Sequence, residues 1–206
     1  MKAFFCIISL ALVHPMLYPK DSTIYIKVHF LYGSRPKKAF KDSEPKWFGG
    51  KLGGHVGIEI DSAHILNFVP DGSFHYFAHP RSRHSAFALH DPESFWSIFG
   101  TPGDSAKKLT IYIPATMAQK HKLDSLSNVF ATNTPYDYAF LGMRCGAAGY
   151  DVLAQLGTLN IRSLGWTKLR IFYPRKLRKK LLRLAERHGW KLEWHRGSSR
   201  RAWEKD

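Results

Sequence analysis

The stretch HVGIEIDSAHILNFV, residues 55 to 69, contains two short apolar runs that predict the hairpin on which the fold is built. The first run, His55 to Ile60, is a strand in which His55, Gly57 and Glu59 share one face, because side chains alternate across a strand. The second run, His64 to Val69, is expected to be its hairpin partner. Two glycine pairs precede His55, so its ring is expected at the end of a sheet.

The segments on either side of this hairpin predict a mixed α+β fold. Further strands are expected over Thr23–Tyr32, Ser73–Ala78 and Lys108–Ile113, with an irregular or partly helical excursion around His79–Pro92. Helices are expected from an N-cap at Thr116 to about Ala131, from Cys145 to about Leu156, and from Pro174 to about His188, before a last strand over Trp190–Trp194. We therefore predict a central antiparallel sheet with the Cys145 helix packed against it.

Charge is concentrated at the C-terminal end of the chain. The 206 residues carry a net charge of +15 and are 44% hydrophobic, enough for one full core. From residue 162 onward fifteen Lys and Arg face four acidic residues. We predict a catalytic domain over residues 21–160 and a basic helical appendage over residues 161–206. Its amphipathic helix is suited to an anionic membrane or envelope surface, or equally to packing through its leucines with a solvated basic face.

The first 20 residues are typical of a signal peptide. The apolar run Ala3 to Val13 follows Lys2 and is too short to span a bilayer. This pattern favours export to the periplasm or a membrane-associated location, although His14 and Pro15 stand where a cleavage site is expected. The alternatives are a buried first strand or an uncleaved anchor, and without a signal peptide the protein is expected in the cytoplasm.

The chain has two cysteines, and only Cys145 lies outside the apolar leader. A processed chain would therefore contain no internal disulfide. Cys145 is expected at a helix N-terminus, where the helix dipole favours a thiolate. The small residues Gly146 to Gly149 leave the backbone amides accessible to an oxyanion. From this segment alone, a buried structural cysteine remains the alternative.

A histidine and a third polar residue would complete a cysteine nucleophile. His55 can serve as the base, and its ring needs a partner that fixes its tautomer and orientation. Asn67 follows twelve residues later, on the expected neighbouring strand. His75 is the rival third residue if the hairpin register differs.

The stretches HVGIEID from His55 and ILNF around Asn67 resemble the corresponding strands of NlpC-type papain-like cysteine peptidases. The usual member places the cysteine helix before the histidine strand. Here the order is reversed, as in lecithin retinol acyltransferase-like proteins and related permuted bacterial members. The resemblance covers roughly residues 24–156 and implies a papain-like fold with Cys145, His55 and Asn67 as the catalytic residues.

Two positions depart from that family pattern, and two tyrosines agree with it. The usual Asn or Asp before the cysteine is Arg144 here, and the third residue is Asn67 where His is commoner. Arg144 is expected to stabilise a thiolate or to bind an anionic substrate. Tyr136 and Tyr138 resemble the aromatic approach to the nucleophile and are expected at the oxyanion or substrate site.

These residues together predict a cysteine hydrolase that cleaves an amide or ester through a Cys145 acyl-enzyme. The resemblance implies a cell-wall peptide, a glycopeptide or a lipid as substrate. The alternatives are a non-catalytic module that binds an anionic envelope polymer or lipid, and an acyltransferase that uses the same thioester. No cofactor or metal is expected, because the histidines lack a compact ligand pattern. Nucleic acid is an unfavoured partner, since no recognition motif accompanies the charge.

Overall fold

The structure is a computed structural model that describes residues 24–47, 49–72, 76–79, 85–100 and 102–206. The expected signal peptide, residues 1–20, lies outside the described residues, as does the rival third residue His75. The described strands are β1 (Ile24–Leu31), β2 (Ser34–Pro36), β3 (His55–Glu59), β4 (Ile65–Pro70), β5 (Ser85–His90), β6 (Lys108–Ala115), β7 (Lys191–His195) and β8 (Arg201–Trp203).

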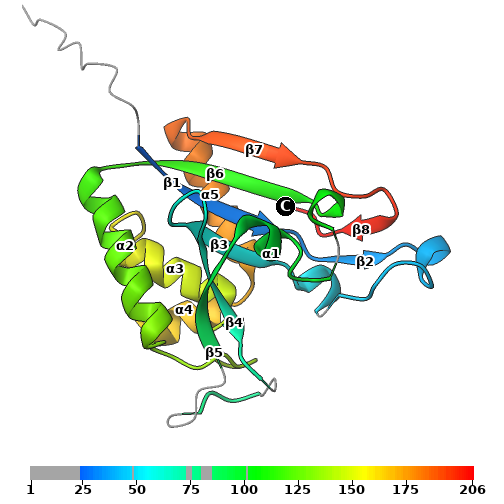
Figure 1. Cartoon of the computed structure of the whole chain (residues 1–206), viewed down its shortest axis with the longest axis horizontal. Coiled ribbons are helices and arrows are strands. Elements are labelled where there is room, and N and C mark those ends of the chain that lie inside the picture. The colour runs from blue at the N-terminus through cyan, green and yellow to red at the C-terminus, as the bar shows by residue number, and fades with distance from the viewer. Residues whose placement is uncertain (1–23, 48, 73–75, 80–84, 101) are drawn as a thin grey trace, which may run out of the picture.

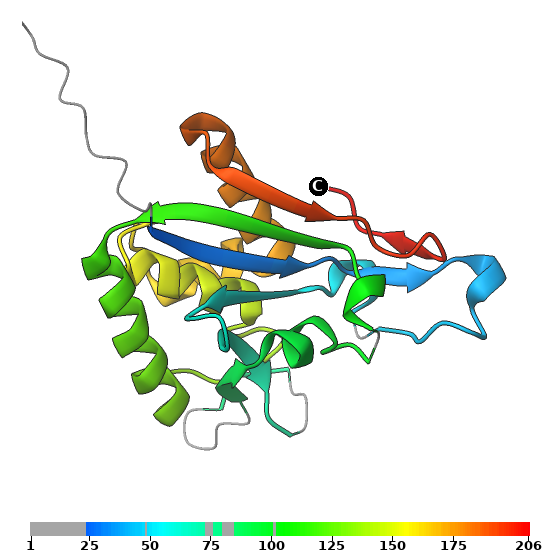
Figure 2. The same ribbon diagram turned by 45° about the horizontal axis from the view of Figure 1, so that its top comes forward.

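The fold is α+β, with a central antiparallel sheet and helices packed on it (Figure 1). The sheet has the strand order β5-β4-β3-β1-β6-β7, and β2 pairs with β8 in a separate two-stranded ribbon. The described helices are α1 (Pro92–Trp96), α2 (Met117–Thr132), α3 (Cys145–Gln155), α4 (Leu164–Arg170) and α5 (Pro174–His188). Helix α3 packs on β3 and β4, and α5 packs on α3 and β6. Figure 2 shows β7, β6 and β1 running side by side, with α5 behind them.

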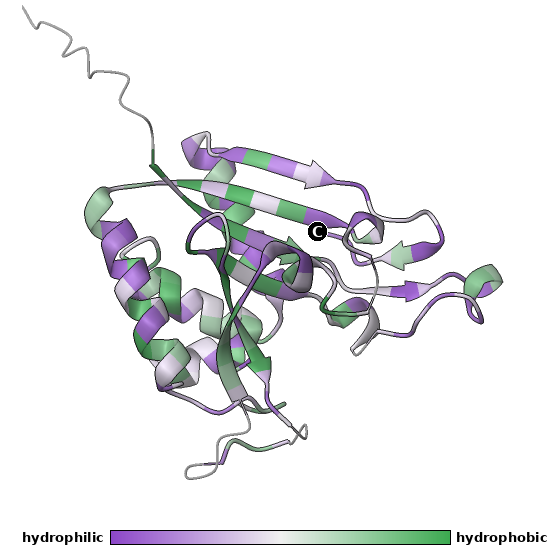
Figure 3. Cartoon of the chain, viewed as in Figure 1, coloured by the Kyte–Doolittle hydropathy of each residue, from purple (hydrophilic) through white to green (hydrophobic). Residues whose placement is uncertain are grey.

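Alternating side chains give the sheet two different faces. Hydrophobic and hydrophilic positions alternate along β6 and β7 (Figure 3). Val28, Val56 and Leu66 belong to the large core under α3 and α5. Leu31 and Ile65 point the other way, into a smaller cluster with Phe95 of α1. Residues that share a face with these two, His55 among them, therefore lie on the α1 side of the sheet.

The C-terminal segment is part of the fold and differs from the appendage that the charge pattern predicted. Strand β7 pairs with β6 in the central sheet, with Leu109 opposite Trp194. Leu177 and Leu181 of α5 are fully buried in the large core, which stabilises the fold by about 1.5–3 kcal/mol for each side chain. Packing through the leucines of α5 was one of the two arrangements that its amphipathic pattern predicted, and it is the arrangement in the structure.

Buried ion pairs attach the last residues to the rest of the fold. Arg178 of α5 is fully buried and donates at 2.8 Å from Nε to Asp206 and at 2.8 Å from Nη1 to Glu204. Glu204 also accepts a hydrogen bond from the backbone N–H of Gly33, between β1 and β2. Removing one partner of the Arg178–Glu204 pair, in which both side chains are buried, costs about 3–5 kcal/mol. The chain end therefore supports the ends of β1 and β2.

The third hairpin strand lies further along the chain than expected. The expected strand Ser73–Ala78 falls partly outside the described residues, and residues 76–79 form no strand. The strand beside β4 is β5. Asn67 of β4 lies opposite Ala88 of β5, and Phe68 lies opposite Phe87. Phe87 packs against Phe68 at 5.0 Å between ring centroids, so side-chain packing accompanies the β4–β5 ladder where an irregular excursion was expected. Within the described residues, no helix is long and apolar enough to cross a membrane.

Candidate active site

Cys145 is the first residue of helix α3, as the sequence predicted. The residue before it, Arg144, has an extended backbone with φ −135° and caps the helix without a side-chain hydrogen bond. Cys145 is only 4% exposed. The next residue must be glycine, because a Cβ on Gly146 would lie 2.8 Å from the backbone N of Pro174. The start of α5 therefore packs directly on the start of α3.

The thiol lies where the two hairpin strands separate. The ladder between β3 and β4 runs from Glu59 and Ile65 to its last pair, Gly57 and Asn67. Cys145 lines a small gap at this end, together with Val56 and Phe68. The backbone N–H groups of Gly146 and Val56 lie near the thiol sulfur and lower the pKa of Cys145, although burial has the larger, opposite effect. The open end of the hairpin thus places Cys145 beside the strand that carries His55.

His55 and Asn67 form a hydrogen bond across the hairpin. His55 Nε2 lies 2.9 Å from Asn67 Oδ1, and both side chains are buried. The Nδ2 group of Asn67 donates to the carbonyls of Ile65 at 3.2 Å and Ala88 at 3.1 Å. Because carbonyls only accept, the amide must point its NH₂ toward them and its oxygen toward His55. His55 therefore carries its proton on Nε2, which leaves Nδ1 as the proton-accepting nitrogen.

The surroundings of His55 keep its imidazole neutral. Burial lowers the pKa of His55 to about 4, with a smaller contribution from the charge of His90, while the bond to Asn67 opposes the shift. The ring centroid lies 5.7 Å from that of Phe95. Phe95 reaches this position because residue 57 is glycine: a Cβ there would lie 2.6 Å from Cε2 of Phe95. An unprotonated imidazole at neutral pH can act as a general base.

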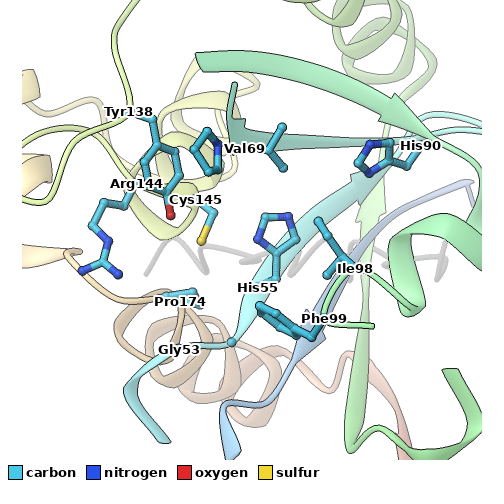
Figure 4. Close-up of a pocket in the computed structure, with 12 residues that line it drawn as sticks. Gly53, His55, Val69, His90, Ile98, Phe99, Tyr138, Arg144, Cys145 and Pro174 are labelled. Atoms are coloured by element: carbon cyan, nitrogen blue, oxygen red, sulfur yellow. The ribbon is translucent and has the colours of Figure 1, made fainter. Parts of the chain in front are cut away.

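Cys145 and His55 line the same cavity, which has a volume of about 480 Å³. In Figure 4 the Cys145 side chain lies between Tyr138 and His55. In the described part of the chain, no hydrogen bond joins the thiol to the imidazole. The lining residues are Gly53, Gly54, His55, Val69, Pro70, His90, Ile98, Phe99, Tyr138, Arg144, Cys145 and Pro174.

The resting thiol is protonated, because burial raises the pKa of Cys145. The positive charge of Arg144 opposes this effect, as do the two backbone amides and the Tyr138 hydroxyl, but desolvation is the largest contribution. A buried thiol beside a neutral imidazole can be activated only when its proton moves during attack. The site therefore suits general-base activation and not a preformed ion pair.

The two tyrosines expected at the site have different locations. Tyr138 lines the cavity, and its hydroxyl contacts the side chains of Arg144 and Cys145. Tyr136 lies in the core, with its ring 5.3 Å from that of Phe68 and its hydroxyl 3.4 Å from Asp151 Oδ2. It is not among the residues that line the cavity. Thus Tyr138 is placed to contact a substrate and Tyr136 to pack the core.

Arg144 lines the cavity beside the thiol. Its guanidinium carbon lies 4.6 Å from the ring centroid of Phe172 and 5.0 Å from that of Tyr173. Both positions are within the range of cation–π attraction. Arg144 is therefore a buried cation held between aromatic rings.

His90 is a site residue that the sequence did not single out. It lies on β5, and its Nδ1 lies 3.2 Å from Asn67 Nδ2, so the two N–H groups of this amide are shared between His90 and the two carbonyls. Only the strand register could have indicated that His90 belongs to the site. Asn67 lies opposite Ala88, and His90 follows two residues later on the same face of β5. Since β5 was not predicted, this relationship was not visible. The row His55, Asn67 and His90 runs across three neighbouring strands.

The site shows no metal-binding arrangement. In the ranges that the structure describes, no group of three or more His, Cys, Asp or Glu side chains is placed to hold a metal ion. His55 and His90 are separated by Asn67, which bonds to both. These three side chains are thus engaged with one another.

Comparison with known proteins gave no match to a family model, to a curated protein or to a solved structure. The residues and geometry of the site are therefore the basis for a functional assignment.

Proposed function

We propose that the chain is a cysteine-dependent hydrolase of permuted papain-like design that cleaves an amide or ester bond. The observation that carries this proposal is the bond from His55 Nε2 to Asn67 Oδ1 in the cavity that Cys145 also lines. It leaves His55 Nδ1 free to accept the thiol proton. The antiparallel sheet with α3 packed on β3 and β4 supports a papain-like arrangement.

In the proposed reaction, Cys145 Sγ attacks the substrate carbonyl as His55 Nδ1 takes the thiol proton. A carbon–sulfur bond forms and the carbonyl oxygen becomes an oxyanion. The backbone N–H groups in the first turn of α3, which begins at Cys145, are proposed as its hydrogen-bond donors. The imidazolium then protonates the departing amine or alcohol. Water attacks the thioester with His55 as base, which releases the acid and restores the thiol.

Asn67 acts as a positioning residue in this reaction. Its oxygen holds the Nε2 proton, so the ring cannot adopt the other tautomer. The same bond stabilises the imidazolium, because it raises the pKa of His55 against the effect of burial. Asn67 in turn is fixed by two backbone carbonyls and by His90.

The cavity wall favours an acyl group with apolar character. Val69, Ile98 and Phe99 line it together with two prolines. A lipid ester or an apolar acyl amide suits this wall, and a cell-wall peptide or glycopeptide is the other substrate class in the proposal. An acyltransferase would use the same thioester and differ only in the acceptor that replaces water.

A silent binding module is the second candidate function. Two observations favour it: burial keeps the thiol protonated, and no hydrogen bond joins Cys145 to His55 among the described residues. Turnover of p-nitrophenyl octanoate separates the two candidates. The hydrolase releases p-nitrophenol at a rate that Cys145→Ala abolishes while circular dichroism is unchanged. Equal release by both proteins contradicts the hydrolase.

The basic surface of α5 is proposed to hold the protein on an anionic membrane. Leu177 and Leu181 are buried in the core, whereas Lys176, Arg183 and Arg187 are exposed. Exposed cations of this kind gain affinity near anionic lipids. The protein is expected to sediment with phosphatidylglycerol vesicles at low salt and not with phosphatidylcholine vesicles; equal sedimentation with both contradicts the proposal.

A further inference from the structure

Arg144 is a buried cation with unsatisfied donors. Arg144 is only 6% exposed. The atoms Nε and Nη1 are buried and have no hydrogen-bond partner within the described residues. No ion pair with a described Asp or Glu neutralises its charge. Buried charges in proteins are ordinarily paired with an opposite charge, because desolvation is costly.

Aromatic stacking accounts for only part of this environment. The guanidinium carbon lies 5.5 Å from the ring centroid of Phe140, in addition to its contacts with Phe172 and Tyr173. Ring faces attract the charge of a guanidinium, but they do not accept hydrogen bonds from Nε and Nη1 as oxygens do. The rings therefore orient the cation and leave two donors available.

The buried Arg178 provides a comparison within the same chain. Arg178 also stacks on a ring, with its guanidinium carbon 3.7 Å from the centroid of Tyr32. Its charge is neutralised by Glu204 and Asp206 at 2.8 Å. Arg178 does not line the substrate cavity, whereas Arg144 does. Of these two buried arginines, Arg144 has no carboxylate partner among the described residues, and Arg144 is the one that lines the cavity.

Arg144 also lies close to the reacting sulfur. It directly precedes Cys145, and its charge acts on the Cys145 thiol and on the Tyr138 hydroxyl. A group bound by Arg144 is thus near the carbonyl that Cys145 would attack. The apolar wall of Val69, Ile98 and Phe99 lines the rest of the cavity. The cavity therefore combines one cationic position with an apolar surface.

We propose that Arg144 binds an oxyanion of the substrate, a carboxylate or a phosphate, while the apolar part of the same molecule occupies the cavity against Val69, Ile98 and Phe99. The proposal rests on the hydrolase function for its meaning in catalysis. The binding step itself does not require the thiol. The substrate class is accordingly an anionic amphiphile with its scissile carbonyl next to the charged group.

Binding to the Cys145→Ala protein tests this proposal without turnover. The probes are decanoate, monodecyl phosphate and decanamide, measured by calorimetry. An oxyanion paired with a buried guanidinium is expected to bind about ten- to a hundredfold tighter than the neutral amide of the same length. Preference for decanoate assigns a carboxylate, and preference for monodecyl phosphate assigns a phosphate. Equal affinity for all three probes, or no binding, overturns the proposal.

Two further variants show whether Arg144 carries the preference. Adding Arg144→Met is expected to remove the preference for the anion and to leave decanamide binding within about twofold. The matched control is Arg162→Met, which removes a guanidinium that stacks on Trp166 at 5.5 Å and does not line the cavity. It is expected to retain the preference. If Arg144→Met retains the preference, the proposal is wrong; if it does not fold, the probe ratio of the Cys145→Ala protein decides.

The two proposals fail in different ways. If the wild-type protein does not hydrolyse the ester but the Cys145→Ala protein prefers the anionic probes, the hydrolase is contradicted and the oxyanion site is supported. Hydrolysis that proceeds equally on neutral and anionic esters contradicts the oxyanion site and leaves the hydrolase standing.

Discussion

His55 and Asn67 are joined across the β3–β4 hairpin by a hydrogen bond of 2.9 Å between Nε2 and Oδ1. The backbone carbonyls that hold the Asn67 amide also decide which way this bond runs, since they require its NH₂ group. The tautomer of His55 is thus set by the backbone of β4 and β5. The proposed general base depends on this relationship.

Replacing Asn67 removes the hydrogen-bond acceptor that orients His55. In Asn67→Ala, ester hydrolysis is expected to fall about a hundredfold or more, because the imidazole can turn or change tautomer. The acid limb of the rate profile should also move to lower pH, since the bond to Asn67 raises the pKa of His55. The exposed Asn128→Ala is the control and should keep the wild-type profile. An unchanged profile in Asn67→Ala contradicts the positioning role.

The pH dependence of hydrolysis reports the protonation of His55. Its pKa is lowered to about 4 by burial, so the base remains unprotonated as the pH falls through the usual range of histidine near 6.5. The rate of acylation is expected to hold down to about pH 5 and to be lost through pH 4. Stopped-flow release of p-nitrophenol measures it. If the acylation rate instead falls with a midpoint near pH 6.5, the imidazole is solvated and the proposal of a buried base is contradicted.

Alkylation by iodoacetamide distinguishes a neutral thiol from a preformed thiolate. Burial raises the pKa of Cys145, so the midpoint of the curve of alkylation rate against pH should lie above about 8.5, the pKa of an ordinary cysteine thiol. Arg144→Met should move the curve further up, because the Arg144 charge lowers this pKa. The measurement is made in a Cys6→Ser background, which leaves one cysteine. If the alkylation rate no longer changes with pH around neutrality, the thiol is already ionised, which contradicts a protonated resting thiol.

Gly146 tests the contact between the starts of α3 and α5. A Cβ there would lie 2.8 Å from the carbonyl carbon of Tyr173 and from the backbone N of Pro174. Gly146→Ala is therefore expected to lower the free energy of unfolding by about 1–3 kcal/mol. Gly165→Ala in α4 has open space around it and should raise this free energy by about 0.5–1 kcal/mol. Urea unfolding measures both changes. If the free energy of unfolding of Gly146→Ala equals that of the wild type, the close contact is refuted.

Elements with a strong local pattern were predicted well from the sequence. The hairpin of β3 and β4 was recognised from its alternation, α2 from its cap at Thr116, and α3 from the glycine that follows it. The juxtaposition of His55 and Asn67 followed from their spacing on adjacent strands. Local pattern fixes where an element begins and which face it buries.

Long-range pairing accounts for what was missed. Strand β5 is specified by the packing of Phe87 on Phe68, which no local pattern reveals. The role of the C-terminal segment depends on Arg178 pairing with Glu204 and Asp206, while sequence composition showed only excess charge. The location of Tyr136 in the core and of Tyr138 at the cavity depends on how the loop before α3 folds back. Such contacts are set by tertiary packing and not by propensity.

The acyl-enzyme itself tests the account most directly. The Cys6→Ser protein is mixed with p-nitrophenyl octanoate, quenched in acid and analysed by intact mass and peptide mapping. The account predicts one octanoyl group per chain, attached to Cys145, and adduct formation about a hundredfold or more slower in His55→Ala. An adduct on another residue, or no adduct at any pH in a folded protein, would contradict it.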